Sequence, residues 1–401
     1  MKHTPVYDNT PYTTLKPKSA SYFLLLMVAL VLAIAGLYAA YTMEHAGHHI
    51  TGMNNHVVWG LPHVFAVSLI VAASGALNGA SLSSVFGNDV YKPFARLSIL
   101  LAVSLLLGGL MVLVLDLGRP DRLAVAMTHY NFRSIFTWNI FLYTGFIAIS
   151  VLYLWVLMER RMNRYVRSVG SFAFAWRLIL TTATGSIFGF LVGRNALDSA
   201  LLAPLFIALS LVMGTAILAL VLTTTLRWKK KTIESIVVES LEKLLLWFLL
   251  ALLYFSVVHH LTNLYAAEHR ASERFTLTGG LAGIFWLGHV VMGLLVPIGI
   301  IVLAAIKTAV HRLLAVSILA LLGGGTLVYA IIIGSQSTPQ RLFPGHIIVA
   351  SEFGDAGFDV YSATIWEWGL GIAGVAVAIL IYTLSMRVLA SMPEQTSSLN
   401  G

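Results

Sequence analysis

The chain has 401 residues, of which 58% are hydrophobic and 10% are charged, whereas soluble domains usually carry about a quarter charged residues. The absence of cysteine excludes disulfides, thiolate zinc sites, cysteine-ligated iron–sulfur clusters and covalently attached c-type haem from this chain. The net charge of +8 could suggest nucleic acid as a partner, but the basic residues lie in short segments between apolar runs, where they indicate membrane topology instead.

Ten apolar stretches are long enough to cross a bilayer, which takes about 20 residues in a helix. They lie at residues 20–43, 57–86, 94–117, 134–158, 170–193, 199–226, 238–264, 277–306, 313–335 and 363–389. We therefore predict an all-α integral membrane protein of about ten transmembrane helices, arranged as two four-helix bundles plus two additional helices. The predicted parts are a tail of residues 1–19, a membrane domain of residues 20–389 and a tail of residues 390–401.

The first stretch lacks a small-residue cleavage site and runs past signal-peptide length, so we expect it to be a retained helix. With the N-terminus inside, the inner segments hold sixteen of the 25 basic residues and the outer segments hold seven. The positive-inside rule then favours both termini in the cytoplasm. We expect a multi-pass protein of the bacterial inner membrane, with the lipid bilayer and not nucleic acid as its surroundings.

The second stretch begins with many hydrogen-bonding side chains, in the sequence NNHVVWGLPHVFAV of residues 54–67. His56, Trp59 and His63 are spaced i, i+3 and i+7, which predicts one shared helix face, and Pro62 is expected one turn in, where it frees a backbone carbonyl. At the helical rise, His63 would lie on the order of 10 Å inside the boundary. An interfacial aromatic belt and helix capping would explain Trp59 alone, whereas a buried His63 needs a specific partner.

Two further polar groups follow at the same predicted outer side. In VLDLGRPDR, residues 114–122, Asp116 and Arg119 can pair across i and i+3, and a purely structural ion-paired helix end is an open alternative. The sequence HHLTNLYAAEHR, residues 259–270, brings His259 and His260 to the end of the seventh stretch.

The inner half offers a sparser set of polar residues. Arg177 lies in the fifth stretch, and Glu239 and Glu242 lie at the inner end of the seventh, where Lys243 can neutralise Glu239 across i and i+4. With His289 of the eighth stretch, Arg177, Glu239 and Glu242 mark a possible proton path.

A polar cluster at one end of the helices suits a lipophilic ligand with a polar head that enters from the bilayer, and a quinone is such a ligand. Its oxygens need donors in the quinone form and acceptors in the quinol form, and His, Asn and Tyr can serve as both. A histidine near its midpoint can relay the protons.

These motifs resemble the polysulfide-reductase membrane-subunit family, often called NrfD-like. The resemblance rests on LDLGRPDR, on VVWGLPHVFAVSLIVAASGALN and on IFWLGHVVMGLLVPIGI, and it covers about residues 50–390. The sequence TGMNNHVVWGLPHVFAV looks like the DsrP branch, a subunit of a complex of dissimilatory sulfur metabolism.

The resemblance implies a chain with no metal, haem or iron–sulfur cluster of its own, which binds menaquinone or ubiquinone near the outer face. The implied partners are a periplasmic ferredoxin-like iron–sulfur subunit, a multihaem cytochrome c, a haem-b membrane subunit and a cytoplasmic iron–sulfur subunit. In this reading the chain is a component of an oxidoreductase and not a stand-alone enzyme.

The family's quinone-contacting residues are carried over by position. Its His and Asn match His63 and Asn55, with His56 and Asn54 as rivals, and Asp116 and Arg119 come from the signature itself. The family's pocket tyrosine has no clear match, and Tyr130 is the nearest candidate. The predicted set is therefore His63 and Asp116 as catalytic residues and Asn55, His56, Trp59, His63, Arg119, Tyr130 and His259 as quinone-binding residues.

Two other functions compete with this reading. A di-haem cytochrome b needs histidine pairs on facing helices, which His63, His259, His260 and His289 do not clearly form. A secondary transporter would show repeated halves around a midplane polar site, whereas the polar groups here lie off-centre.

Overall fold

The computed structural model describes residues 11–17, 19–339 and 361–394, and these residues are almost entirely helical. Within them, nine helical segments are long and apolar enough to cross a membrane. They are α1 (Ala20–Ala46), α2 with α3 (Leu61–Ala76, Asn78–Ser84), η2 with α4 (Asp89–Phe94, Ala95–Leu115), α6 (Ile135–Met158), α8 (Leu202–Trp228), α9 (Ser235–Tyr265), η5 with α11 (Ile284–Leu295, Val296–Val302), α12 (Ala309–Ser337) and α13 (Ile365–Val388). The predicted class, an all-α integral membrane protein, is confirmed.

The tenth predicted span behaves differently. Residues 170–193 were expected to cross the membrane, and they lie largely in helix α7 (Val166–Gly189), which is not among the nine helices apolar enough to do so in the described residues. Arg167, Arg177 and a run of Ser, Thr and Gly make α7 more polar than its neighbours. It still packs between α6 and α8, and the polar side chains of Arg177, Thr181 and Thr184 are buried against other helices.

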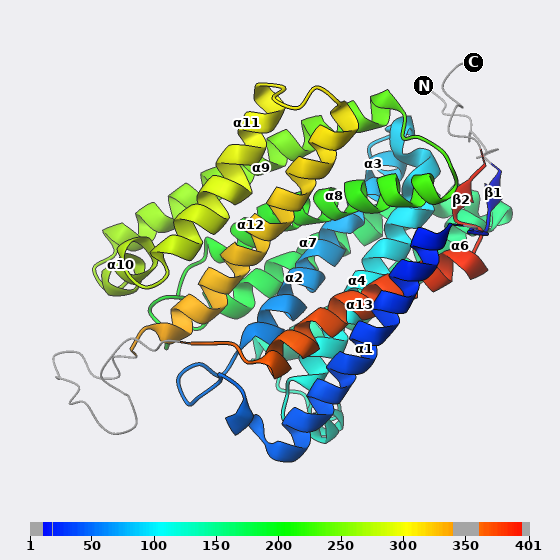
Figure 1. Ribbon diagram of the computed structural model, residues 1–401. Coiled ribbons are helices and arrows are strands. Elements are labelled where there is room, and N and C mark those ends of the chain that lie inside the picture. The colour runs from blue at the N-terminus through cyan, green and yellow to red at the C-terminus, as the bar shows by residue number, and fades with distance from the viewer. Residues whose placement is uncertain (1–10, 18, 340–360, 395–401) are drawn as a thin grey trace.

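The long helices form two groups of four with two helices outside them (Figure 1). Helices α2, α4, α6 and α7 make the first bundle, and α8, α9, η5 with α11, and α12 make the second. Helix α13 packs on α2 and α4, and α1 packs on α13. Short helices connect them: η1 (His48–Ile50), η3 (Pro120–Arg122), α5 (Leu123–Ala126), η4 (Arg160–Tyr165) and α10 (Arg270–Thr278).

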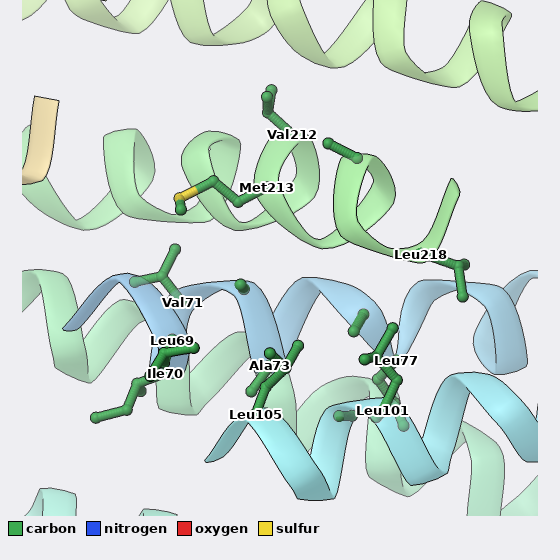
Figure 2. Packing of buried hydrophobic residues seen from close by; sticks show 14 of the residues in the cluster. Leu69, Ile70, Val71, Ala73, Leu77, Leu101, Leu105, Val212, Met213 and Leu218 are labelled. Carbon is green, nitrogen blue, oxygen red and sulfur yellow. The ribbon is translucent and has the colours of Figure 1, made fainter. Parts of the chain in front are cut away.

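The two bundles meet where α2 crosses α8. A Cβ atom added to Gly75 would lie 1.7 Å from the Ser210 carbonyl oxygen, and one added to Gly214 would lie 2.0 Å from the Gly75 carbonyl carbon. Only glycine therefore allows this backbone approach, which is how small residues bring membrane helices together. Figure 2 shows the surrounding packing, with α2 between α8 and α4.

The two ends of the described chain meet at one end of the bundles, which we call the clasp end. Strand β1 (Tyr12–Thr13) pairs antiparallel with β2 (Met392–Pro393). The Lys229 ammonium donates to Thr13 Oγ1 at 2.7 Å, and the Arg96 guanidinium lies 3.7 Å from the centre of the Tyr12 ring. The opposite end, where α2 begins and α4 ends, is called the site end.

Candidate functional site

Helix α2 begins later than the sequence predicts. Its N-cap is Gly60 and its first residue is Leu61, so Pro62 lies in the first turn, where the missing N–H costs nothing. The expectation that Pro62 frees a carbonyl one turn into the helix is therefore wrong. For the same reason His56 and Trp59 lie in the loop before α2 and do not share a helix face with His63.

Gln336, at the end of α12, holds this loop in place. Its Oε1 accepts hydrogen bonds from the backbone N–H groups of Val58 and Trp59, both at 2.9 Å, and its Nε2 donates to the Trp59 carbonyl at 3.0 Å. Arg194 donates to the His56 carbonyl at 3.0 Å. Much of the polarity before α2 thus satisfies backbone groups, as buried loops require.

His63 is positioned by an aromatic ring. The Trp59 indole stacks on its imidazole with the ring centres 5.1 Å apart and the planes 7° from parallel, and it meets the Phe188 ring of α7 edge-on at 5.9 Å. No described residue hydrogen-bonds the His63 ring. Its nitrogens are therefore open to a ligand or water, while the Asn55 side chain is exposed in the loop.

Asp116 is the C-cap residue of α4, just beyond the membrane-spanning segment, and one of its carboxyl oxygens has no hydrogen-bond partner among the described residues. This oxygen, Oδ1, is buried. Burial, and then the nearby charge of Glu367, raise the pKa of Asp116 to about 8. The carboxyl group is therefore mostly protonated at neutral pH and can act as a hydrogen-bond donor.

Arg119 does not pair with Asp116 as the spacing predicted. Its Nε lies 3.3 Å from Asp121 Oδ1, and the two side chains are 65% and 62% exposed. The reason is local: Gly118 has φ of +70°, which ends the helical register in which i and i+3 would meet. The Arg119–Asp121 pair is a surface ion pair and contributes little to stability.

Glu367 organises the same end of the molecule. It is fully buried at the start of α13 in a capping box with Thr364, and its Oε2 accepts from the Gly52 and Thr364 N–H groups, both at 2.8 Å. Its Oε1 accepts from the Tyr361 hydroxyl, whose oxygen accepts from the Leu61 N–H at 2.6 Å. Glu367 thereby ties α13 to the start of α2.

A large apolar cavity of about 820 Å³ lies between α2, α4, α8, α12 and α13. Leu61, Tyr329 and Trp368 line its site end, and Thr225, Trp228 and Tyr382 line its clasp end. Between Met213 and Trp228 of α8 it follows the helix for about 22 Å at the helical rise. Among the described residues, none hydrogen-bonds the Tyr329 hydroxyl, so this end of the cavity offers an open polar atom.

The cavity and His63 lie on opposite sides of α2. The face of α2 that lines the cavity carries Leu61, Phe65 and Ser68, and His63 is about half a turn away from that face. Gly109 of α4 packs against the Ala66 carbonyl, so His63 is directed towards the α4 and α7 side.

The other predicted residues lie apart from the cavity. Tyr130 packs with Phe132 and Phe141 in an exposed aromatic group after α4, with ring centres 5.9 and 4.7 Å away. His259 is buried at the end of α9, next to Ser199 and Asn263. The structure does not bring either residue to the cavity.

The four residues of the possible proton path are divided between the two bundles. Buried Arg177 of α7 points its guanidinium at the Ser74 carbonyl, 3.5 Å away, in the first bundle. In the second bundle, Arg312 binds Glu242 through two contacts of 2.9 and 2.8 Å, and Glu239 is exposed. His289 has Ser256 and the Gly323 carbonyl on its two nitrogens, both at 3.2 Å.

Glu367, Tyr361, Gln336 and Tyr329 were absent from the predicted binding set. The sequence T364-x-x-E367 is a recognisable capping-box signal, and it could have identified the start of α13. The roles of Gln336 and Tyr361 depend on contacts over 277 and 300 residues of sequence separation, for which a single sequence carries no signal.

Comparison with known proteins identifies relatives along nearly the whole chain. The sequence model of the family described as "Polysulphide reductase, NrfD" matches residues 49–340. The chain is 27% identical to the Hdr-like menaquinol oxidoreductase integral membrane subunit of Archaeoglobus fulgidus, over 94% of this chain and 95% of that protein. It is 24% identical to the menaquinone reductase integral membrane subunit of Nitratidesulfovibrio vulgaris, over 90% and 89%. A putative dimethyl sulfoxide reductase membrane subunit of Halobacterium salinarum is 28% identical, over 90% of each chain.

Proposed function

The chain belongs to the polysulphide reductase NrfD family, and on this premise we propose that it is the quinone-interacting membrane subunit of a multi-subunit oxidoreductase. The relatives named as membrane subunits of a menaquinol oxidoreductase and a menaquinone reductase support this function. Menaquinone or ubiquinone would be the ligand, and electrons would pass between it and a redox partner outside this chain.

The apolar cavity is the observation that carries the proposal. Its walls are almost entirely apolar along a length of about 22 Å, which suits an isoprenoid tail. Its site end has the open hydroxyl of Tyr329, which can donate to a quinone oxygen or accept from a quinol. A ligand with a long apolar chain and a polar ring matches both ends.

Asp116 is the proposed proton-exchanging group near the head group. Quinol oxidation releases two electrons, which go to the partner, and two protons, which need acceptors; reduction reverses both transfers. A carboxyl group with a pKa of about 8 exchanges protons readily at neutral pH. Asp116 is not itself on the cavity lining, and it adjoins the site end through the nearby charge of Glu367 at the start of α13. His63 and the remaining predicted contacts, Asn55, His56, Trp59, Arg119, Tyr130 and His259, also lie outside the lining.

The distribution of basic residues supports a position for the redox partner at the site end. The clasp end carries Arg96, Lys229 and Lys231, so the positive-inside rule favours this end in the cytoplasm and the site end outside. Leu117, Val125 and Phe132 follow α4 at the site end and are 50%, 57% and 59% exposed. These apolar side chains lie beyond the span and offer a docking surface for another protein of the complex.

The finer assignment follows the sequence resemblance. We propose a bacterial inner-membrane complex of dissimilatory sulfur metabolism, in which a periplasmic ferredoxin-like iron–sulfur subunit docks at the site end. A multihaem cytochrome c and a haem-b membrane subunit would complete it. Isolation of the complex from its native membrane and identification of its subunits by mass spectrometry tests this assignment; a complex without an iron–sulfur protein contradicts it.

Narrowing the cavity tests quinone binding directly. Gly325 of α12 lines the cavity, and a Cβ atom there would meet nothing within 4 Å, so Gly325→Phe can place a ring in the cavity. We expect the KM for a long-tailed menaquinol to rise about tenfold with kcat nearly unchanged, because tail binding is lost equally in the ground and transition states. The KM for a short-tailed analogue should stay within about twofold.

Gly299→Phe in α11 is the matched control, because Gly299 also has open space around it but does not line the cavity. Kinetics that change equally for both analogues, or for neither, would contradict the proposed tail site. His63→Ala, measured in parallel, shows whether the α4 and α7 side of α2 contributes to turnover.

A further inference from the structure

A second polar cavity lies at the site end and has no part in the proposed quinone site. It measures about 40 Å³ and lies between the end of α9, α10 and the segment of residues 195–197. A cavity needs roughly 10–15 Å³ of this kind of volume to hold one water molecule, so it has room for water but not for a quinone ring. Its polar lining includes Asn195, His259, His260, Asn263, His269, Ser272, Glu273, Thr276 and Ser335.

Glu273 is the acidic group of this cavity. It is 4% exposed, its Oε2 accepts from Asn263 Nδ2 at 3.3 Å, and its Oε1 contacts His260 Nδ1. An imidazole nitrogen and a carboxyl oxygen in contact must have a hydrogen between them. The His260–Glu273 pair therefore holds a proton in a buried position.

His259 is fixed in one tautomer by its neighbours. Asn263 Nδ2 lies 3.3 Å from His259 Nε2, and Ser199 Oγ lies 3.3 Å from His259 Nδ1. Because an amide NH2 group can only donate, Nε2 is the acceptor and Nδ1 carries the hydrogen. His259 is thus a neutral, fully bonded part of the cavity wall.

His269 has a ring nitrogen that is available to bind water. Its side chain is 7% exposed and lines the cavity, and its buried Nδ1 has no partner among the described residues. Its Nε2 lies 3.5 Å from the exposed carboxylate of Glu268. A buried nitrogen without a partner, next to space for water, indicates a bound water molecule.

Among the described residues that line the cavity, the only basic side chains are imidazoles. Helix α9 contributes His259 and His260, His269 precedes α10, and η5 places His289 behind the Phe285 ring, whose centre is 4.5 Å from that of His260. Helix α12 contributes Ser335, and the guanidinium of Arg194 binds the His56 carbonyl instead. The carboxyl group of Glu273 therefore faces imidazole groups in this cavity and no Lys or Arg side chain of the described cavity lining.

We propose that this cavity is a hydrated proton-binding site, in which water connects His269 with a proton shared between Glu273 and His260. Its wall adjoins the contacts to the loop before α2, because Ser335 and residues 195–197 line the cavity and their sequence neighbours Gln336 and Arg194 bind that loop. The site stands on its own geometry and does not depend on quinone binding.

Infrared spectroscopy of the full chain in lipid tests the site without any turnover. The pH titrations use the Asp116→Asn background, because Asp116 would contribute a titrating carboxyl band of its own. In that background we expect a protonated-carboxyl band that shifts in D2O, is lost in Glu273→Gln and changes its midpoint in His260→Gln and His269→Gln. Glu268→Gln is the matched control, because Glu268 lies next to His269 and is 69% exposed. That variant should leave the band unchanged.

In the Asp116→Asn background, a titrating band that Glu273→Gln leaves unchanged overturns the proposal, and so does a midpoint that neither histidine substitution moves. If Glu273→Gln does not fold, the His269→Gln titration decides alone, since His269 is not part of the Glu273 contact. A band that behaves as expected in a chain that binds no quinone would support this site while rejecting the proposed function, so the two failures are distinguishable.

Discussion

Polar residues at the site end divide into those whose atoms are all engaged and those with an atom left open. Gln336 and Glu367 belong to the first group, because each binds backbone N–H groups of the loop before α2. Asp116, Tyr329 and His63 belong to the second. Of the second group, Tyr329 lines the cavity and is the expected ligand contact, whereas Asp116 and His63 lie outside the lining and are open to water. A satisfied buried group gains little from a new partner.

The carboxyl group of Asp116 gives stability a specific pH dependence. Its pKa is raised from 3.8 to about 8 by burial and by Glu367, so the folded protein holds a proton that the unfolded chain releases. This contribution is fully present below pH 3.8 and is lost as the pH rises through about 8. Asp116→Asn keeps the neutral form at all pH values, so its melting temperature should fall less than that of the wild type between about pH 6 and pH 9.

Thermal melting in lipid nanodiscs across that pH range checks the prediction. Asp121→Asn is the control, because Arg119 lowers the pKa of Asp121 and its titration ends well below neutral pH. Parallel melting curves for the wild type and Asp116→Asn would contradict a buried carboxyl. Turnover of quinol by Asp116→Asn should fall about 100-fold, the usual contribution of a proton-exchanging group.

Glu367→Gln should destabilise the protein although the glutamine side chain has nearly the same size and shape as glutamate. Oε2 accepts two N–H groups, so the amide oxygen must take that position, and the NH2 group then leaves the Tyr361 hydroxyl without its acceptor. We expect a loss of about 1–3 kcal/mol in unfolding free energy. Chemical denaturation measures it, with exposed Glu268→Gln as the neutral comparison; an unchanged midpoint would mean that Glu367 is not a buried acceptor.

At the scale of elements, the crossing of α2 and α8 depends on two glycines. Gly214→Ala places a Cβ atom 2.0 Å from the Gly75 backbone, so the helices must separate. The expected cost is about 1–3 kcal/mol or more. Gly299→Ala meets nothing within 4 Å and should be nearly neutral, and equal melting temperatures for the two variants would refute the close crossing.

Hydrophobic runs predicted nearly every long helix, because lipid and buried neighbours both require apolar side chains. They failed in two informative places. The start of α2 was predicted four residues early, at residue 57, because Val57 and Val58 continue the apolar run while their backbone groups bind Asn54 and Gln336. Helix α7 was predicted as a span, and among the described helices it is less apolar than the nine candidate spans, because buried Arg177 and its polar face belong to the interior of the first bundle.

At the scale of the whole molecule, the cavity forms only when helices far apart in the sequence pack together. Helices from both bundles, together with α1 and α13, supply its walls, so it cannot be inferred from the pattern of any one helix. The sequence predicts a site at the end where costly polar groups gather, which is the end where the proposed quinone head group would lie. The sequence could not show that Asp116 and Arg119 do not pair, since that depends on the turn at Gly118. It also could not show that His63 lies away from the cavity, since that depends on which side of α2 faces α8.

The most direct test of the proposed quinone site is to label the chain with a photoreactive menaquinone and map the modified peptides by mass spectrometry. A reactive group on the ring should modify the site end of the cavity, at the start of α2, the start of α13 or Tyr329, and one on the tail should modify α8 or α12 near Gly325. Excess unlabelled menaquinone should prevent both. Ring labelling at the end of α9, or no protectable labelling in this chain, would contradict the proposed quinone site.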